Sequence, residues 1–522
     1  MEPIAAISTP YGKGGVALIR ISGDGAIDIA ASVFFPANRR PLADIKDRFS
    51  VFGSIRMPVP GTDEASLTHP EADNQEHITE TAAPNGTVRD VRNTNAEPAA
   101  ETEKHPDADA PAFPGEEIDT GLCTLFRAPH SFTGEDTAEI SCHGGVLVTS
   151  HVLAAVLASG ARQALPGEFT RRAFLNGKMG LDAAEALGSL LDAKTGEQLR
   201  LARTGMKGVL GNETAGIYRD LTHVLSSVFA CIDYPDEDLA EMSREDMANA
   251  VRRISDRLGA LADTWKTGRA IMEGIPTVLL GRVNAGKSSL YNLLSGSDAA
   301  IVTDIAGTTR DVLTETLSLG RVTLRLSDTA GIRDTSDTVE QIGVSRALRK
   351  SKEAGLLLPV FDASDELGAD DLSLIRRLCA EFPDTPVVAV LNKCDLPVRT
   401  DEARLLSAFG TLGDRSPAAI VRLSAKTGEG LEALTRAVEA LFVDGSLDPA
   451  TDAIVLGARQ YAAILRAHEA VRAAQRSIDG GYPVDLSCDD LEAAMSALSE
   501  LDGRAVSEDV VTDIFSRFCV GK

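Results

Sequence analysis

The feature that most constrains the fold is the run G-R-V-N-A-G-K-S at residues 281–288, which directly follows the apolar residues Ile275 to Leu280. This pattern is typical of a P-loop, so it predicts a buried strand, a glycine-rich turn and a helix. In such a turn the backbone N–H groups converge on an anion, and the helix N-terminus adds its positive end. Lys287 would reach the outer phosphates, and the Ser288 hydroxyl would ligate Mg²⁺. We therefore expect a nucleoside triphosphate site.

Three further motifs follow in the order of a guanine-nucleotide-binding domain, each at the C-terminal end of an apolar segment. Asp328 would hold the Mg²⁺ shell through water, and Gly331 would face the γ-phosphate. Asp395 would accept from the ring N–H and the exocyclic amine of guanine, and its carboxylate would stay unpaired if adenine bound, which selects GTP over ATP. The segments and motifs are Leu324 to Ser327 with Asp328, Thr329, Ala330 and Gly331; Val387 to Leu391 with Asn392, Lys393, Cys394 and Asp395; and Ile420 to Leu423 with Ser424, Ala425 and Lys426.

A polar loop at residues 303–311 is a candidate switch segment. It reads T-D-I-A-G-T-T-R-D and is of the kind that orders only when the γ-phosphate and metal are present. Thr309 is the expected second side-chain ligand of Mg²⁺. The remaining predicted GTP-binding residues are Asn284, Ala285, Gly286, Lys287, Ser288, Ser289, Thr303, Asp304, Ile305, Ala306, Gly307 and Thr308.

Hydrolysis of GTP needs a group that orients water, and Ile332 stands where Ras-type enzymes keep a glutamine for this purpose. Other residues must therefore organise the reaction. Asn284 is placed to help hold a monovalent cation against the phosphates, and Glu340 is a candidate for orienting the water. The residues alone favour a plainer interpretation of Glu340, as a solvated carboxylate near a helix start.

Length and composition set the remaining limits. At 522 residues the chain is long enough for roughly three domains of about 150 residues each. It contains no apolar run as long as a membrane span, and its N-terminus lacks the basic and apolar regions of a signal peptide. The seven cysteines show neither a close pair nor metal-ligand spacing, which suits a reducing compartment and predicts no structural zinc. We expect a soluble, cytoplasmic protein without membrane contact.

An acidic segment carries about half of the net charge of −25. A net negative charge argues against binding to the phosphates of a nucleic acid. Residues 61–120 contain fifteen acidic and three basic side chains, so the rest of the chain is much less acidic and this argument is weaker. The segment is rich in Pro, Ala, Thr, Asn and Asp and has few large apolar side chains, so it cannot bury enough surface to offset ordering. We predict a disordered insertion at residues 58–118, which is more often a tolerated loop extension than an interaction tail.

Apolar patterning predicts strands before and after this insertion and long helices later in the chain. Helical periodicity occurs on both sides of the GTP-binding segment, which is most simply one helical domain with an α/β module inserted into it. The expected fold class is therefore α/β and α, with a Ras-like parallel sheet in the inserted domain. The predicted domains are an N-terminal α/β domain at 1–177, a G domain at 274–446, and a helical domain whose two segments lie at 178–273 and 447–522. The expected strands and helices include Ile4 to Ile7, Val16 to Ile21, Gly121 to Leu125, Thr137 to Cys142, Leu181 to Leu191 and Leu221 to Ile232.

Several longer runs resemble the MnmE (TrmE) family of tRNA modification GTPases. The resemblance spans nearly the whole chain outside the insertion. Its most discriminating piece is the terminal Cys519-Val-Gly-Lys522, because other translation-related GTPases with a similar GTP-binding segment lack it. The matching runs are T-P-Y-G-K-G-G-V-A-L-I-R-I-S-G, F-T-G-E-D-T-A-E-I-S-C-H-G-G, P-G-E-F-T-R-R-A-F-L-N-G-K-M, G-R-V-N-A-G-K-S, T-D-I-A-G-T-T-R-D, D-T-A-G-I-R and F-C-V-G-K.

The resemblance implies two cations at the GTP phosphates. In the family a potassium ion lies beside the phosphates and neutralises charge on the transferring group, as an arginine finger would. The family's water-orienting glutamate falls on Glu340, which reverses the plainer interpretation above. The implied ligands are Ser288 and Thr309 for Mg²⁺, and Asn284, Thr303, Ile305 and Thr308 for K⁺.

The resemblance also implies that the N-terminal domain has a folate-binding fold. Its contacts to a tetrahydrofolate derivative, 5,10-methylene- or 5-formyl-tetrahydrofolate, map to Arg20, Glu139, Lys178 and Lys522. These residue types suit a folate, because a carboxylate can accept from the donors of the pterin ring and basic side chains can bind the glutamyl carboxylates. Cys519 would lie close to the folate, and both a catalytic role and an inert terminal thiol stay open.

The family's reaction is the GTP-dependent modification of the wobble uridine of certain tRNAs at C5. The family works as a homodimer in a heterotetramer with a flavoprotein, MnmG (GidA), and uses a one-carbon unit from the folate. Two alternatives are a ribosome-assembly GTPase and a GTP-dependent scaffold without folate chemistry. A ribosome factor would be expected to carry a basic RNA-binding domain, which this acidic chain does not show.

Two residues depart from expected patterns. Val283 replaces the proline usual in the family's P-loop, which should relax φ without removing a phosphate donor. Pro359 interrupts the predicted strand Leu356 to Phe361, where a missing N–H would cost a ladder bond, so we expect a local bulge there.

Overall fold

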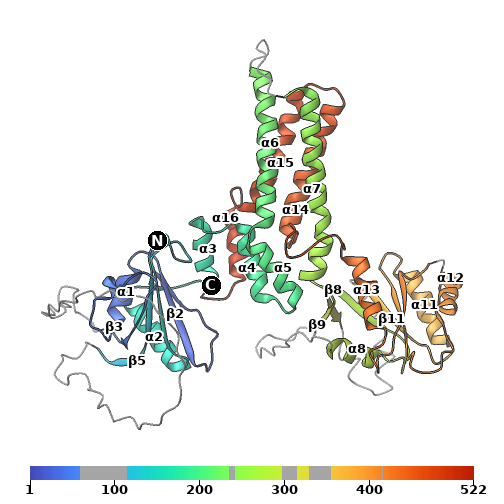
Figure 1. The fold of residues 1–522 in the computed structure, drawn as a ribbon, viewed down its shortest axis with the longest axis horizontal. Helices are drawn as coiled ribbons and strands as arrows, with labels where there is room; N and C mark the ends of the chain where they lie inside the picture. Colours follow the sequence, from blue (N-terminus) through green and yellow to red (C-terminus); the bar gives the residue numbers. More distant parts are fainter. Residues whose placement is uncertain (59–114, 234–241, 297–313, 328–353, 414, 522) are drawn as a thin grey trace, which may run out of the picture. The chain divides into compact units, whose positions relative to one another are not determined.

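The structure, a computed structural model, describes residues 1–58, 115–233, 242–296, 314–327, 354–413 and 415–521 (Figure 1). Its contacts divide the chain into two compact units, of which one is Met1–Lys178 together with Phe515–Lys522 and the other is Met179–Ile514. The first unit therefore combines residues from both ends of the sequence.

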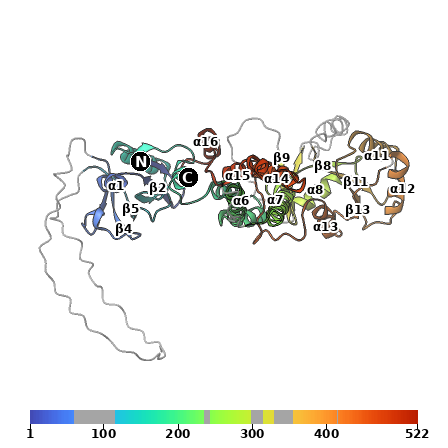
Figure 2. The ribbon, with the colours of Figure 1, turned by 90° about the horizontal axis from the view of Figure 1, so that it is seen from above.

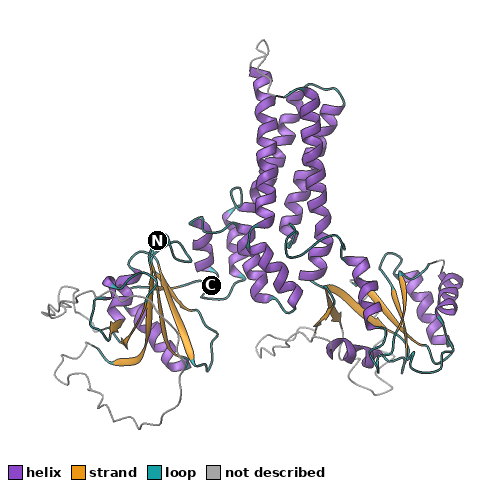
Figure 3. Ribbon diagram, viewed as in Figure 1, coloured by secondary structure: helices purple, strands orange, loops and turns teal. Residues whose placement is uncertain are grey.

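The first unit is built on one seven-stranded sheet of order β3-β4-β5-β6-β2-β1-β7. Alternate residues of its central strands, such as Ile19, Ile21 and Ile140, share a core with residues of α1 and α2. Figure 3 shows the strands of this unit together with its helices. The elements are β1 (Ile4–Ile7), β2 (Val16–Ser22), α1 (Ala26–Val33), β3 (Phe34–Pro36), a 3₁₀ turn (Leu42–Asp44), β4 (Ser50–Arg56), β5 (Glu117–Phe126), β6 (Thr137–His143), α2 (Val146–Ala158), β7 (Arg162–Gln163) and α3 (Glu168–Leu175).

The predicted insertion begins and ends between two paired strands. β4 and β5 are antiparallel neighbours, and Arg56 of β4 lies opposite Glu117 of β5, with 2.6 Å between their charged groups. The predicted boundary at residue 118 is therefore wrong, because Glu117 and Ile118 already belong to β5. The acidic composition of residues 116–119 led the sequence analysis to place them in the insertion, although Glu117, the first residue of β5, forms an ion pair with Arg56. Residues 59–114 lie outside the described residues, so the disorder prediction for them stays a prediction.

The end of the chain packs on the N-terminal sheet, which corrects the predicted helical segment at 447–522. Val520 forms a bridge with Pro166, and the Gly167 N–H donates to Cys519 O at 3.4 Å. The Ser8 hydroxyl donates to Gly521 O at 3.2 Å. A side chain at Gly521, where φ is 96°, would overlap the backbone of Ile7, so only glycine fits this approach.

The second unit contains a bundle whose helices come from both sides of the G domain. Buried residues of α6, α7, α14 and α15, such as Leu221, Ile254, Ile464 and Leu498, form one core. Figures 1 and 2 show these four helices side by side. The helices are α4 (Leu181–Asp192), α5 (Gly196–Met206), α6 (Val209–Asp233), α7 (Arg244–Met272), α14 (Ala458–Asp479), a 3₁₀ turn (Val484–Ser487), α15 (Cys488–Asp502) and α16 (Glu508–Ser516), which runs into the first unit.

The G domain has a six-stranded sheet of order β13-β12-β11-β8-β10-β9, and every neighbouring pair is parallel except β10 with β9. Helices α8 and α13 share a core with one face, and α11 and α12 share a core with the other. The fold class predicted from the sequence is thereby confirmed. The elements are β8 (Ile275–Leu280), α8 (Lys287–Gly296), β9 (Thr314–Leu319), β10 (Val322–Ser327), β11 (Leu356–Asp362), α11 (Ala369–Glu381), β12 (Val388–Asn392), α12 (Glu402–Gly413), β13 (Ala419–Arg422) and α13 (Leu431–Phe442).

Pro359 lies inside central strand β11 without the expected bulge. The Leu357 N–H donates to Pro386 O at 2.9 Å, and the same parallel register resumes where Val360 pairs with Val390. Continuing that pattern, residue 359 would donate the next bond to β12, and proline cannot. Pro359 instead pairs with Leu280 of β8 on its other side. The strand thus loses one bond and keeps its register.

None of the helices in the described ranges is long and apolar enough to cross a membrane.

Candidate functional site

The phosphate loop joins β8 to α8 and adopts a shape that depends on three residues with positive φ. These angles are 149° at Gly281, 63° at Asn284 and 96° at Gly286. A Cβ on Gly281 would lie 2.5 Å from Val360 O, and one on Gly286 would overlap the side-chain amide of Asn392. Asn284 tolerates the left-handed region better than most residues. The backbone conformation of the loop therefore explains why glycine or asparagine occupies these three positions.

Lys287, at the start of α8, crosses the phosphate loop. Its ammonium donates to Gly281 O at 3.0 Å and to Arg282 O at 2.9 Å. These bonds hold the positive charge over the concave side of the loop, where the phosphates of a nucleotide would lie. Ser288 follows at the second position of the helix, and its hydroxyl is the kind of hard oxygen ligand that Mg²⁺ takes.

Asn392 ties the phosphate loop to both base-binding motifs. Its side chain is 2% exposed, donates to Ala285 O at 2.9 Å and accepts from the Ala425 N–H at 2.9 Å. Sequence reasoning placed Asn392 in a base-binding motif but missed this bridging role. The bridge fixes the distance between the segments that bind phosphate and base.

Asp395 lies at the open side of the same arrangement. The Ser424 hydroxyl donates to Asp395 Oδ1 at 2.7 Å and, with the nearby Lys426 and Lys393, holds the pKa of this carboxyl below its ordinary value. Asp395 is therefore an ionised acceptor at neutral pH, as recognition of the two guanine donors requires.

A cavity of about 580 Å³ connects these groups. The predicted residues that line it are Gly286, Ser289, Asn392, Lys393, Asp395, Ala425 and Lys426. Sequence reasoning missed three of its residues, and a signal existed for two of them, because α8 places positions three and four residues after Ser289 on one helix face. The missed residues are Asn292, Leu293 and Leu396.

Three aspartates, at the end of β11, in the turn after it and in α11, receive one cation from each nucleotide-binding loop. Lys393 pairs with Asp362 at 2.6 Å, and Arg282 pairs with Asp365 at 2.8 Å and with the buried Asp371 at 3.4 Å. Burial raises the pKa of Asp371, whereas hydrogen bonding to Arg282 lowers that of Asp365. Burial also opposes ionisation of Asp362, but hydrogen bonds from Lys393 and Ser364 bring its pKa below the ordinary value. These aspartates therefore hold both nucleotide-binding loops in place through ion pairs.

Several predicted GTP and metal residues lie outside the described residues. Of the predicted Mg²⁺ and K⁺ ligands, the described ranges contain Ser288 and Asn284, and both offer the oxygen donors that these cations take. The same ranges hold no cluster of three or more His, Cys, Asp or Glu side chains suited to a metal. The predicted residues outside are Thr303, Asp304, Ile305, Ala306, Gly307, Thr308, Thr309, Asp328, Thr329, Ala330 and Gly331, together with the predicted catalytic Glu340.

In the N-terminal unit, Arg20 and Glu139 lie opposite each other on β2 and β6. Both Nε and Nη2 of Arg20 lie 2.8 Å from Glu139 Oε1. The guanidinium also lies 5.5 Å from the ring centroid of Phe132 and 5.7 Å from that of Phe169. Within the described ranges Glu139 Oε2 has no partner, so it is available to accept from a ligand. Phe132 adds a partly exposed aromatic ring that sequence reasoning missed.

The other predicted folate contacts approach the same sheet from separate elements. Lys178 donates to Pro129 O at 2.8 Å, in the loop that also carries Phe132. Cys519 is exposed on the C-terminal segment, which lies against the loop before α3 and the end of β1. Lys522 lies outside the described residues.

Comparison with known proteins decides the family. A model described as the MnmE helical domain matches residues 181–519, and one described as the GTP-binding protein TrmE N-terminus matches residues 85–178. The chain belongs to the MnmE family of tRNA modification GTPases. It is 37% identical to tRNA modification GTPase MnmE of Heliobacterium modesticaldum over 527 residues, covering 100% of this chain and 99% of that protein. It is 34% identical to the protein of the same name from Thermoanaerobacter pseudethanolicus over 523 residues, again covering 100% and 99%.

Proposed function

We propose that this chain is a GTP-hydrolysing enzyme that modifies C5 of the wobble uridine of certain tRNAs in the cytoplasm. It would add a carboxymethylaminomethyl or aminomethyl group together with a flavoprotein of the MnmG (GidA) type, using a one-carbon unit from a tetrahydrofolate derivative. The observation that carries the nucleotide assignment is the Asn392 bridge, which holds the phosphate loop and Asp395 around one cavity. Family membership supports the tRNA assignment.

The geometry suggests how the described residues would bind GTP. Backbone N–H groups of the phosphate loop and the Lys287 ammonium would hold the phosphates, and Asp395 would take both guanine donors. Ser288 would hold Mg²⁺ and Asn284 would help hold K⁺, and these cations would neutralise charge on the transferring phosphoryl group. Glu340 is proposed to orient the attacking water.

We expect GTP hydrolysis to require potassium. Asn284→Gly should lose most of the potassium stimulation while keeping nucleotide affinity, because glycine removes the side chain and accepts the φ of 63° without strain. Asn284→Ala should lose the stimulation too, with an added backbone cost of roughly 1 kcal/mol. Phosphate release measured in potassium and in sodium chloride at equal ionic strength tests this. Equal rates in the two salts for the wild-type chain would contradict the potassium assignment.

The folate assignment is supported by the chemistry of the Arg20–Glu139 pair. Glu139 keeps one oxygen open, and its partner Arg20 lies beside the Phe132 ring, an arrangement that suits a flat ring that carries donors. Lys178 and Lys522 would meet the glutamyl carboxylates of the ligand. The docked C-terminal segment would place Cys519 nearby, with a catalytic role for its thiol still a proposal.

Deleting residues 519–522 is expected to weaken binding of a reduced folate by one to two powers of ten while sparing GTP turnover. A charge-assisted contact to a ligand carboxylate is worth roughly 1.5 to 3 kcal/mol, and the deletion also removes the backbone contacts to Gly167 and Ser8. Calorimetry with 5-formyl-tetrahydrofolate measures the loss. Lys522→Gln keeps the docked segment and separates charge from docking. Wild-type affinity in the deletion variant would refute the C-terminal contribution.

A homodimer is proposed from the open face of the N-terminal sheet. Phe52 and Leu122 lie directly opposite each other on β4 and β5 and are 56% and 45% exposed. Val16, on the same face of β2, is 65% exposed. An apolar face of this kind usually marks an interface. A second copy of the chain would cover it, and two flavoprotein chains would complete the heterotetramer.

Reconstitution tests the proposed reaction as a whole. The purified chain, an MnmG-type flavoprotein, unmodified tRNA, GTP, potassium and a reduced folate should together yield the modified nucleoside. Omitting GTP or the folate should each abolish the product. Product formation without any folate would remove the folate from the proposal and leave the GTPase assignment intact.

A further inference from the structure

A second cavity, of about 330 Å³, lies at the turn between β1 and β2. Ile7 and Ala17 line it, and both belong to the core that the sheet shares with α1 and α2. Arg20 and Glu139 lie on the other face, because Ala17 and Arg20 are an odd number of residues apart on one strand. Neither Arg20 nor Glu139 lines the cavity, although Val16, which does, belongs to their face of the sheet.

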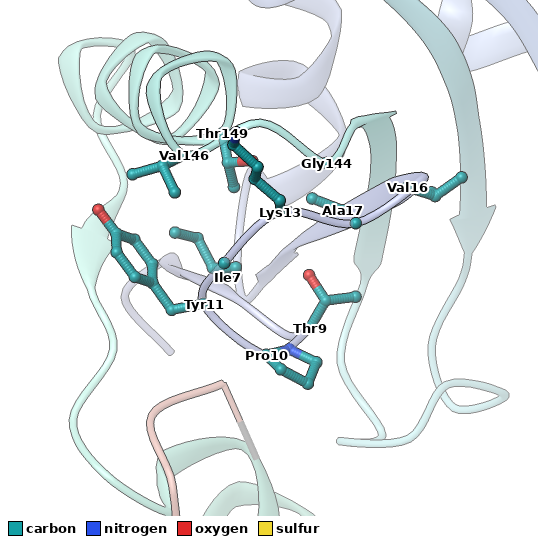
Figure 4. Close-up of a pocket in the computed structure, with 12 residues that line it drawn as sticks. Ile7, Thr9, Pro10, Tyr11, Lys13, Val16, Ala17, Gly144, Val146 and Thr149 are labelled. Atoms are coloured by element: carbon teal, nitrogen blue, oxygen red, sulfur yellow. The ribbon is translucent and has the colours of Figure 1, made fainter. Parts of the chain in front are cut away.

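The walls of this cavity combine an aromatic ring, an apolar floor and one cation. Tyr11 is 71% exposed, and Figure 4 shows its ring beside Ile7 and the Lys13 side chain directed toward Thr149 of α2. Lys13 is the one charged residue among those lining the cavity. In the described ranges Lys13 has no ion pair, although the whole chain carries a net charge of −25. These residues would suit a ligand that combines a flat ring with one negative charge.

The turn that carries Tyr11 and Lys13 is held in place by backbone contacts. The Gly14 N–H donates to Gly144 O at 2.8 Å, and a Cβ on Gly144 would lie 2.5 Å from Gly14 O. The Leu18 N–H also donates to the Thr9 hydroxyl at 3.3 Å. The cavity is thus formed before any ligand arrives, which lowers the entropic cost of binding.

We propose that this cavity is a subsite for one unpaired nucleotide of the tRNA. The base would stack on Tyr11 and enter over Ile7, and the adjoining phosphate would meet Lys13. Bases of single-stranded loops are commonly held on aromatic side chains in this way, whereas the bases of a double helix are not accessible to such a cavity. Lys13 is the one cation among the residues lining the cavity, so the cavity suits a single stacked nucleotide with one phosphate contact. This inference rests on the proposed tRNA substrate.

Binding of a labelled anticodon stem-loop RNA to the full-length chain tests the subsite. Tyr11→Ala should weaken binding about tenfold, and Tyr11→Phe should restore it, because stacking needs the ring and not the hydroxyl. Lys13→Ala should lower the slope of log affinity against log salt concentration by about one. Lys46 and Phe49 provide the matched control, since they form an exposed pair of the same chemistry, with the ammonium 5.3 Å from the ring centroid, away from the cavity.

The controls separate the subsite from the function on which it rests. Phe49→Ala and Lys46→Ala should leave RNA affinity unchanged, and Tyr11→Ala should keep wild-type GTP turnover and 5-formyl-tetrahydrofolate affinity. RNA affinity in Tyr11→Ala equal to wild type would overturn the subsite alone. Loss of folate affinity with RNA affinity intact would assign the cavity to the folate and overturn the inference. A wild-type chain that bound no RNA would overturn the proposed substrate and the subsite together.

Discussion

Gly286→Ala is expected to weaken GTP binding severely. The added methyl group would overlap the amide of Asn392, and alanine would also be strained at a φ of 96°. Asn392 would have to move, and both of its bonds, to Ala285 O and from the Ala425 N–H, would be lost. The loss of these bonds between buried groups and the changed shape of the phosphate loop should lower the affinity for GTP by at least about 100-fold.

Equilibrium titration with a fluorescent GDP or GTP analogue measures this loss. Gly296→Ala is the matched control, because a Cβ at the end of the same helix would meet nothing within 4 Å. Its affinity should equal that of the wild type. Near-normal affinity in Gly286→Ala would show that the loop can move away from Asn392, and the bridging role would then be wrong.

Asp395→Asn is expected to lower the affinity for GTP by about 100-fold or more and to allow xanthosine triphosphate to bind. The carboxylate accepts from two guanine donors, whereas an amide presents a donor to one of them and leaves that guanine donor unpaired. Xanthine carries an acceptor where guanine carries its amine, so the amide fits it. The Ser424 hydroxyl already orients Asp395 and would orient the new amide at the same place.

Competition between GTP and xanthosine triphosphate for a labelled nucleotide measures this switch. Ser424→Ala keeps the carboxylate and should retain the preference for GTP with only a small loss of affinity. A variant Asp395→Asn that still preferred GTP would refute the assignment of this residue to the base.

The sequence predicted much of this site because its motifs are local. β8 spans the predicted Ile275 to Leu280, and Lys287 and Asp395 lie at the cavity or loop that their motifs indicated. The Asn392 bridge was not predictable in the same way, because it joins residues 107 positions apart and depends on the order of strands in the sheet. Composition also misplaced the end of the insertion, since a strand can begin with paired acidic residues.

The C-terminal segment shows the same limit of local reasoning. Helical periodicity near the end of the chain predicted one domain up to residue 522, and α16 does continue to Ser516. The docking of Val520 on Pro166 and of Gly521 on Ser8 comes from contacts more than 350 positions away in the sequence. Only the resemblance of the last residues to the family connected this segment with the N-terminal domain.

Mass spectrometry of tRNA nucleosides tests the central claim most directly. Cells that lack this chain should lose the C5-modified wobble uridine, and the wild-type gene should restore it. A gene carrying Gly286→Ala should fail, and one carrying Gly296→Ala should succeed. Wobble uridines that remained fully modified without the chain would contradict the proposed function, whatever its GTPase activity.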